Sequence, residues 1–484
     1  MDALALKNTG KILAMVGMFI AVFFALPVGV GMFEGEKVLP FLLFDLGVFL
    51  VSLFAYVLLG KHTVEMRIKD AILTVNIIWL LLGISGAIPF VLSTHVTFVD
   101  GFFEAVSGYT TTGATIYHDI EGLPRHILLL RSLMHWLGGM GIIVLGVGLF
   151  SLINPTGSMA LFKAEATGNK LEKLSAKIRD TAMRIWGVYV LLTLIDMLLL
   201  WGEGMSLFDA VNHAFSTLST GGFSTKNISM AYWQYQPMIL WTTTVFMILA
   251  GINFLAHLRA LRGDFGGYRS EEVRWYLIVF VVLSVALAWY RIETANVHAG
   301  FVITHAFFSV ASILTTTGFG SINYEPWGAP AVVIIFIAMA IGGNAGSTAG
   351  GFKVSRFVVL MKNIGFQIRR MLHPKAITAL YVDGNRISYD TLGIITGFAL
   401  VFTLSNVLLT FYLYARGYDL MTSLSAAIAM VGNIGPGFSR VGVVENYAFF
   451  SNTDKIILAA AMILGRLEFF TVLMLFSRTY WKRF

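Results

Sequence analysis

Thr111-Thr112-Gly113-Ala114-Thr115 is the first of four short stretches that recur along this chain at wide, similar intervals. The others are Ser219-Thr220-Gly221-Gly222-Phe223, Thr316-Thr317-Gly318-Phe319-Gly320 and Asn433-Ile434-Gly435-Pro436-Gly437. Each follows a short apolar segment and precedes a long one. Glycine tolerates positive φ without steric cost, so the backbone at such a turn can direct its carbonyl groups into a lumen. Four such turns around one axis predict a pore in which carbonyl oxygens replace the water shell of a cation.

The composition places the chain in a membrane. Hydrophobic residues make up 57% of it, charged residues only 13%, and the mean hydropathy is +0.77. Several apolar blocks reach the roughly 20 residues that cross a bilayer. The first, residues 12–32, is too long for the core of a signal peptide, so we expect it to be retained. Because the chain has no cysteine, disulfides, thiol catalysis and thiolate metal sites are excluded.

The net charge of +7 is distributed as an orientation signal rather than as a nucleic-acid surface. Lysine and arginine gather in alternate segments: 7–11, 61–69, 163–184, 259–274, 362–386 and 478–483. The intervening loops carry acids that can concentrate cations at a pore mouth, among them Glu34, Glu36, Asp119, Glu121, Glu325 and Glu445. By the positive-inside rule, the basic loops and both termini face the cytoplasm.

The apolar blocks and the basic loops between them predict an all-α integral membrane protein with ten spans. We expect the spans near 11–32, 39–60, 70–92, 125–152, 185–202, 237–258, 275–291, 330–361, 391–415 and 455–477. Four shorter helices, at 101–111, 207–218, 301–314 and 421–431, are too short to cross and have the length of re-entrant segments. Each of them leads into one of the four turns.

The spans divide into two leading helices and four repeats of spanning helix, short helix, turn and second spanning helix. The boundaries are 1–64 for the leading helices, 65–160, 161–260 and 261–372 for the first three repeats, and 373–484 for the fourth. Each repeat starts and ends at a basic loop, so all four point the same way and can surround one axis. Short helices that descend from outside direct their partially negative C-termini at the membrane centre, which favours a cation.

Three fingerprints give the chain a family resemblance. They are His135-Trp136-Leu137-Gly138-Gly139-Met140-Gly141, Ser219-Thr220-Gly221-Gly222-Phe223-Ser224-Thr225, and the run from Gly342-Gly343-Asn344 to Gly351-Phe352-Lys353. With the fourfold layout, they make nearly the whole chain resemble the TrkH-type potassium translocation subunits of the bacterial Trk/Ktr and plant high-affinity potassium transporter superfamily. The two leading helices favour the Trk branch.

The resemblance implies a selectivity filter with one glycine from each turn, which by motif position are Gly113, Gly221, Gly318 and Gly435. All four are glycine, as in the potassium-selective members, whereas some sodium-preferring plant relatives carry serine at the first position. The full expected filter comprises Thr111, Thr112, Gly113, Thr220, Gly221, Thr317, Gly318, Asn433, Ile434 and Gly435. Of these, we expect all but Thr111 and Asn433 to bind the transported K⁺, and we expect no covalently bound cofactor.

A gate is expected in the glycine-rich run of the third repeat. Glycine in a helix interior costs about 1 kcal/mol against alanine, so residues 342–353 should interrupt the helix. An inert kink or a close packing surface is the alternative. The resemblance places the gate here, at Gly346, Gly350, Gly351 and Lys353. Arg466, inside the last expected span, either pairs with Glu468 as a structural contact or faces the lumen and holds the loop closed.

Other polar residues in the spans have simpler explanations. Asp196 is either a coupling site for H⁺ or Na⁺ or an interfacial carboxylate paired with a neighbouring helix. Asn253, His257 and Asn406 are expected to hydrogen-bond between helices. His135 is expected to be a packed or capping residue rather than a metal ligand.

The leading functional hypothesis is K⁺ uptake through a gated pore in the bacterial inner membrane, driven by membrane potential. The alternatives are a K⁺/H⁺ or K⁺/Na⁺ symporter and a membrane scaffold or receptor without transport. No catalytic motif is present, so we expect no enzymatic activity. The resemblance also implies a homodimer and a cytoplasmic ring of TrkA-type nucleotide-binding partners, with the nucleotide on the partner only; we expect contact with lipid and none with nucleic acid.

Overall fold

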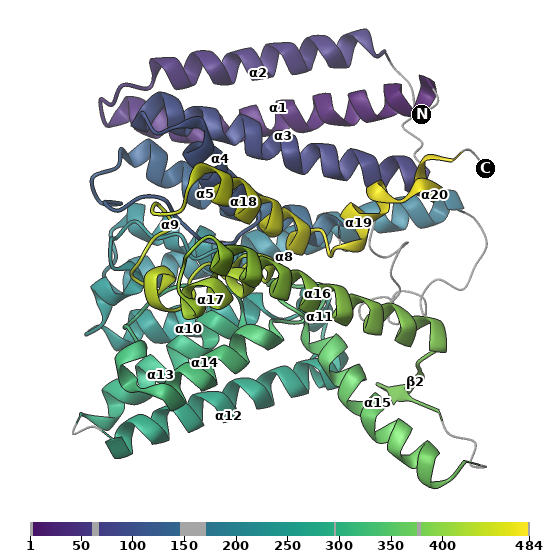
Figure 1. The fold of residues 1–484 in the computed structure, drawn as a ribbon. Coiled ribbons are helices and arrows are strands. Elements are labelled where there is room, and N and C mark those ends of the chain that lie inside the picture. The colour runs from purple at the N-terminus through teal and green to yellow at the C-terminus, as the bar shows by residue number, and fades with distance from the viewer. Residues whose placement is uncertain (1–2, 61–66, 146–170, 295–296, 375–378, 483–484) are drawn as a thin grey trace.

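The computed structural model describes residues 3–60, 67–145, 171–294, 297–374 and 379–482, and these form a helical bundle (Figure 1). Six of the described helices are long and apolar enough to cross a membrane, or up to eight if each of two bent pairs forms one span. The six are α1 (Ala3–Phe33), α2 (Leu39–Leu58), α3 (Ile68–Thr94), α8 (Leu171–Gly202), α12 (Glu271–Thr294) and α16 (Tyr389–Ala415). By length and composition, these helices agree with the predicted helical membrane protein.

Four short helices lie close to the predicted bounds: α4 (Phe98–Tyr109), α9 (Leu207–Leu218), α13 (Ala299–Leu314) and α17 (Leu420–Val431). The first two begin with a capping box. Thr97 and Ser206 are extended residues whose hydroxyls accept the N–H groups of Asp100 and Asp209 and donate to the carboxylates of the same two residues. These caps satisfy orphan N–H groups and fix where the helices begin.

The helices that follow the turns are mostly broken. They are α5 (Arg125–Leu145), the pair α10 (Pro237–Ala250) and α11 (Phe254–Ala260), the pair α14 (Ala329–Ile341) and α15 (Val354–Leu372), and the pair α18 (Asn452–Arg466) and α19 (Phe470–Leu473). α10 and α11 are bent by 100°, and the last pair, extended to Phe476, by 108°. The spans predicted near 237–258 and 455–477 are therefore bent pairs of helices rather than straight ones. Residues 146–152 of the predicted span 125–152 lie outside the described part.

The breaks before α11 and after α18 have local causes. Asn253 caps a new helix by accepting the N–H of Leu255 at 2.9 Å, so α11 starts in a fresh direction. After α18, Glu468 and Phe469 have φ of 54° and 56°. Two consecutive left-handed residues without the freedom of glycine end the helix, and they place Arg466 at its last turn.

Packing around the short helices is cyclic. Each short helix contacts the helices before and after it in the chain, and also the post-turn helix of the preceding set. Thus α9 packs on α5, α13 on α10, α17 on α14, and α4 on α18, which returns the pattern to its start. Segments from the two halves of the chain, α4 and α18, consequently lie side by side (Figure 1).

The remaining described elements are small: η2 (Ser229–Trp233), η3 (Phe265–Arg269), η4 (Glu325–Trp327), η5 (Ser439–Val441), η6 (Met474–Phe476), α20 (Arg478–Trp481), β1 (Tyr381–Val382) and β2 (Asn385–Arg386). The two strands form an antiparallel hairpin that the all-α prediction did not include. Asp383 and Gly384 at its turn both have positive φ, as a two-residue hairpin loop requires. In α20, near the C-terminus, the Tyr480 hydroxyl donates to the Lys69 carbonyl at the start of α3.

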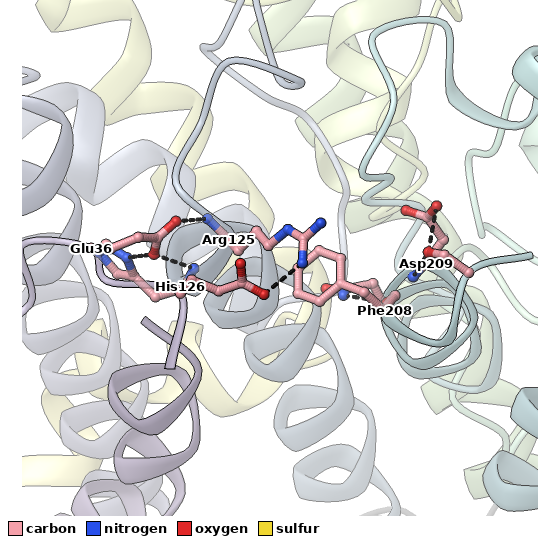
Figure 2. A network of polar contacts seen from close by, with 8 residues as sticks. Glu36, Arg125, His126, Phe208 and Asp209 are labelled. Carbon is pink, nitrogen blue, oxygen red and sulfur yellow. Dashed lines mark hydrogen bonds and ion pairs between the residues drawn. The ribbon is translucent and has the colours of Figure 1, made fainter. Parts of the chain in front are cut away.

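The leading hairpin of α1 and α2 is fastened to the rest of the molecule through its connecting loop. Figure 2 shows Glu36 of this loop at the start of α5, where its carboxylate accepts the N–H groups of Arg125 and His126 and meets the His126 ring at 2.5 Å. The Arg125 side chain bonds Glu34 and lies over the ring of Phe208 in α9. A loop outside the repeats therefore supplies the N-terminal cap of α5.

Candidate functional site: four turns around one axis

All four short helices end in the same backbone pattern. The second residue past each helix end is left-handed, with φ between 53° and 59°: Thr111, Thr220, Thr316 and Asn433. The fourth residue is a glycine with φ between 81° and 92°: Gly113, Gly222, Gly318 and Gly435. Four chemically different stretches thus adopt one conformation.

In the second turn, the backbone conformation selects a different glycine from the one that the sequence motif assigned. Gly222, not Gly221, takes the place of Gly113, and Gly221 corresponds to Thr112. Two successive glycines left the sequence alignment ambiguous by one residue. The backbone removes the ambiguity, because only Gly222 of the two has positive φ.

The residue just before each of these glycines has an unused carbonyl. Its N–H bonds back to the fifth residue before it, in the short helix: Thr112 to Ser107, Gly221 to Ser216, Thr317 to Ser312 and Ile434 to Ala429, at 2.8–2.9 Å. Within the described residues, no backbone N–H bonds to the carbonyl oxygens of Thr112, Gly221, Thr317 or Ile434. A buried carbonyl without a donor needs water or a cation as its partner.

The four turns form a closed ring. A Cβ atom built on Gly113 would lie 2.1 Å from the carbonyl oxygen of Gly221, and one on Gly222 would lie 2.0 Å from that of Thr317. The circle is completed by two further contacts of the same kind: Gly318 to the Ile434 oxygen at 2.3 Å, and Gly435 to the Thr112 oxygen at 2.3 Å. Each glycine is required because its neighbour's carbonyl occupies the space of a side chain.

Side chains brace the ring from behind. The hydroxyls of Thr110 and Thr112 bond each other at 2.7 Å, and those of Thr315 and Thr317 do the same. Asn433 replaces a hydroxyl residue in the fourth turn, and its Nδ2 donates to Thr112 Oγ1 at 3.0 Å. Asn433 therefore joins the fourth turn to the first, a role that the sequence did not reveal.

One cavity opens above the ring. It is lined by all four turn glycines, Gly113, Gly222, Gly318 and Gly435. Its wall also includes Glu445, together with the basic residues Arg131 and Lys226. Of the outer-loop acids expected at a pore mouth, only Glu445 is among these lining residues. Asp119 and Glu121 lie next to this cavity, because both accept hydrogen bonds from the lining residue Asn227, so a role of the acids at the mouth stays a prediction.

Outer-loop contacts fasten three of the four neighbouring pairs of turns. The Ala231 N–H donates to the Gly320 carbonyl at 2.8 Å, and the Tyr447 N–H donates to the Thr115 carbonyl at 2.8 Å. The Glu325 carboxylate accepts the Ser439 N–H at 3.1 Å. These bonds join the second turn to the third, the fourth to the first and the third to the fourth.

The predicted gate loop, residues 342–353, separates α14 from α15 and bonds directly to the short-helix ends. The three bonds run from Gly351 N to Gly432 O (2.8 Å), from Gly350 N to Thr316 Oγ1 (2.7 Å) and from Thr348 Oγ1 to Leu218 O (3.0 Å). Gly346 has φ of 74° and accepts the N–H of Phe254. The loop therefore lies against the second, third and fourth turns, and none of its residues is among those that line the cavity of the glycines.

Arg466 links this loop to the first repeat. It is 3% exposed, and its guanidinium donates to the carbonyls of Thr348 (2.9 Å) and Gly138 (3.2 Å). The alternative pairing with Glu468 is wrong, because Glu468 pairs with Arg356 at 2.5 Å. Lys353 is also buried, and its ammonium donates to the Ala349 carbonyl within the loop.

The other singled-out polar residues fall into three cases. His135 caps the Gly108 carbonyl at 2.7 Å and stacks on Phe223, which confirms a packed, capping role. His257 bridges elements as expected, bonding the Leu249 carbonyl. Asn253 and Asn406 bond within their own helices, so the expected links between helices were wrong.

Asp196 in α8 is buried, and neither of its carboxyl oxygens has a hydrogen-bond partner among the described residues. The interfacial pairing with a neighbouring helix that the sequence suggested is thus not found in this part of the chain. Asp196 is not among the residues that line the cavity of the four turns. The geometry gives no support to a coupling site there.

Sequence reasoning missed a buried ion pair behind the turns. Glu104 of α4 and Arg131 of α5 are 0% and 1% exposed, with 2.8 Å between Oε1 and Nε. The available signal was an acid in one apolar segment and a base in the next, since isolated charges in membrane segments require partners.

Comparison with known proteins points to one family. A family model described as TrkH, cation transport protein, matches residues 44–483. The chain is 36% identical over 432 residues to the Trk system potassium uptake protein TrkH of Escherichia coli (strain K12), covering 87% of this chain and 88% of that protein. It is 31% identical to the Trk system potassium uptake protein TrkI of Halomonas elongata, covering 98% and 96%.

Among solved structures, the crystal structure of the potassium transporter TrkH from Vibrio parahaemolyticus superposes with a TM-score of 0.89 at 29% identity, over 100% of both chains. Family match, sequence relatives and fold therefore agree over nearly the whole length. This chain belongs to the TrkH family of cation transport proteins.

Proposed function

We propose that this protein takes up K⁺ through a gated, K⁺-selective pore whose filter is the ring of four turns. The observation that carries the proposal is the set of four unused carbonyls, Thr112, Gly221, Thr317 and Ile434, each packed against the glycine of the neighbouring turn. Such carbonyls replace the hydration shell of a dehydrated cation. The potassium uptake named for the Trk system relatives supports K⁺ as that cation.

The filter we propose is the set predicted from the sequence with Gly222 added. Gly222 is the positive-φ glycine of the second turn. In this register, the carbonyls of Thr112, Gly221, Thr317 and Ile434 face the ion. The Gly435 carbonyl, by contrast, accepts the Tyr447 hydroxyl at 2.7 Å. An inside-negative potential supplies about 2.3 kcal/mol per charge per 100 mV, which concentrates K⁺ without chemistry in this chain.

The pore architecture we propose has four parallel repeats and two leading helices, ten spans in all, with both termini cytoplasmic in a bacterial inner membrane. The cyclic packing of α4, α9, α13 and α17 supports one axis for the four repeats. For the repeats we keep the boundaries that the sequence predicts. The gate is the loop 342–353, held beneath the turns by Arg466.

Regulation by a TrkA-type nucleotide-binding ring and assembly as a homodimer also belong to this proposal. α15 extends from the bundle (Figure 1) and exposes an apolar stripe of Met361, Ile364, Ile368, Met371 and Leu372. Spacings of three and four residues place these side chains on one face of the helix. An exposed stripe of this kind supports contact with another chain.

The test is cation flux in vesicles that contain the purified protein. We expect K⁺ and Rb⁺ to pass in preference to Na⁺, and the reversal potential to follow the K⁺ gradient whatever the pH. Gly113→Ser should reduce the K⁺/Na⁺ permeability ratio, because its Cβ would meet the Gly221 carbonyl at a left-handed position. Gly187→Ser, in open space on α8, is the matched control. Absence of flux, or a reversal potential that follows pH, would refute the proposal.

A further inference from the structure

A buried ion pair behind the filter has contacts to two turns at once. Glu104 Oε1 accepts the Thr115 hydroxyl at 3.0 Å, and Glu104 Oε2 accepts the Ile116 N–H at 2.9 Å. Both donors belong to the segment that leaves the first turn, two and three residues after Gly113. The carboxylate therefore fixes the path of the chain directly above the first unused carbonyl.

Arg131 carries the contact across to the second turn. Its Nη1 donates to the Ser224 carbonyl at 3.1 Å, and its Nη2 donates to Thr115 Oγ1 at 3.1 Å. Ser224 follows Gly222 by two residues, as Thr115 follows Gly113. The guanidinium also lies 4.0 Å from the centre of the Phe223 ring. One planar fork thus holds the two segments at a fixed spacing, which a flexible ammonium does not reproduce.

The four turns do not share this chemistry. His213 lies in α9 where Glu104 lies in α4, five residues before the helix end, and its ring bonds the Ser224 hydroxyl at 2.9 Å. In the third and fourth turns, serine hydroxyls hold the segment that leaves the turn. Ser312 donates to the Phe319 carbonyl, and Ser425 accepts the Phe438 N–H. Of these backing contacts, only the one behind the first turn is an ion pair.

Stability alone does not account for such a pair. Replacing a buried ion pair by apolar side chains of similar volume is often neutral or stabilising, because both charges must lose their water. A fully bonded buried pair is better explained by what it positions. Here it positions the segments on either side of the contact between Gly113 and the Gly221 carbonyl.

We propose that Glu104 and Arg131 are positioning residues for ion selectivity: together they set the spacing of the carbonyls that the first two turns offer to the cation. This inference rests on the proposed function, since it assigns a determinant of selectivity to the same filter. Arg131 also lines the cavity of the four glycines, but the pair bonds to the chain segments rather than to the filter carbonyls. It acts through Thr115, Ile116 and Ser224.

The deciding variant removes both charges at once. In Glu104→Leu/Arg131→Met, no unpaired charge remains buried, so the protein should fold. Its thermal unfolding temperature should fall somewhat, because the Ile116 N–H and the Ser224 carbonyl lose their partners. We expect K⁺ flux to persist while the K⁺/Na⁺ permeability ratio falls about tenfold, the factor that corresponds to losing one charge-assisted hydrogen bond. A stable double variant with the parental ratio would overturn the inference.

Arg131→Lys decides the matter if the double variant does not fold. It keeps the charge beside Glu104 but loses the fork that reaches Ser224 and Thr115 together, so the ratio should again fall in a folded protein. Arg125→Lys, the same substitution at the exposed start of α5, is the control and should keep the parental ratio. An unchanged ratio in folded Arg131→Lys rejects positioning. If the parent itself carries no K⁺, the proposed function fails first, which is a distinguishable result.

Discussion

At the scale of single residues, the glycine that ends each turn determines how closely the neighbouring carbonyl approaches. The turn needs glycine for two reasons. The residue has a positive φ, and the carbonyl oxygen of the next turn occupies the place of a Cβ atom. A side chain there is strained by about 1–2 kcal/mol before any clash is counted. Substitutions at these glycines therefore report directly on the ring.

Gly222→Ala and Gly221→Ala test the register of the second turn. Alanine at 222 would press on the Thr317 carbonyl, whereas alanine at 221 would press on the His135 ring, 2.3 Å from its Cβ. We expect Gly222→Ala to lower the K⁺/Na⁺ permeability ratio by displacing a ligand. The background variant His135→Ala should relieve the defect of Gly221→Ala but not that of Gly222→Ala. Equal relief of both would contradict the register.

Arg466→Ala should raise the basal K⁺ leak of vesicles that contain this chain without a partner. The substitution removes the two bonds that tie the loop, at Thr348, to Gly138 of α5. Isotope efflux measures the leak. Arg291→Ala, on α12 over the Trp327 ring, is a control of equal charge change. A leak equal to that of the parent would show that Arg466 does not hold the gate.

At the scale of elements, the loop 342–353 is a non-helical segment packed beneath three of the turns. Gly350 is its tightest point, because a Cβ there would lie 2.3 Å from the Gly432 carbonyl. The loop reaches the turns only through glycines and one threonine hydroxyl. Its seating is therefore sensitive to a single added methyl group.

Gly350→Ala should unseat the loop and increase the leak in the same efflux assay. The methyl group cannot be accommodated without moving either the loop or the fourth turn, so a change in selectivity should accompany the leak. Gly365→Ala, on α15 with open space around it, is the matched control. If Gly350→Ala behaves as the parent does, the loop is not seated as described.

The elements were largely predictable, and the exceptions have physical causes. The short helices were found because their lengths and the turns behind them recur. The breaks after Gly251 and Arg466 were not, because an apolar run reads as one helix until a cap such as Asn253 is recognised. Gly221-Gly222 hid the register, and the Glu104–Arg131 pair needed two separate segments to be brought together. Pairings of that kind exist only in three dimensions.

At the scale of the whole molecule, the α1–α2 hairpin is held to the repeats by Glu36 (Figure 2). Burial alone would raise the pKa of this carboxyl, but hydrogen bonds from His126 and from the N–H groups of Arg125 and His126 outweigh it. The pKa therefore lies below its ordinary value of 4.5. A lowered folded-state pKa means that the contact stabilises the protein fully above that ordinary value and is lost as the pH falls through the folded-state pKa.

Glu36→Gln should accordingly lower the thermal stability at neutral pH, by about 1–3 kcal/mol for a charge-assisted contact. The difference between variant and parent should shrink as the pH is brought below 4.5. Thermal unfolding in detergent at several pH values measures both. Glu34→Gln, at the exposed pair with Arg125, should have a smaller effect. A difference that stays constant with pH would show that the charge of Glu36 is not involved.

The interlocking of glycine and carbonyl around the ring also bears on how such a chain can change over generations. A substitution at the glycine of one turn displaces the carbonyl that the neighbouring turn offers to the ion, so the defect arises at a different turn from the mutation. The quarters are consequently not free to drift as independent copies, even though their side chains already differ. Viable changes must arrive in compensating sets, which makes the site slow to acquire a new ion preference one substitution at a time.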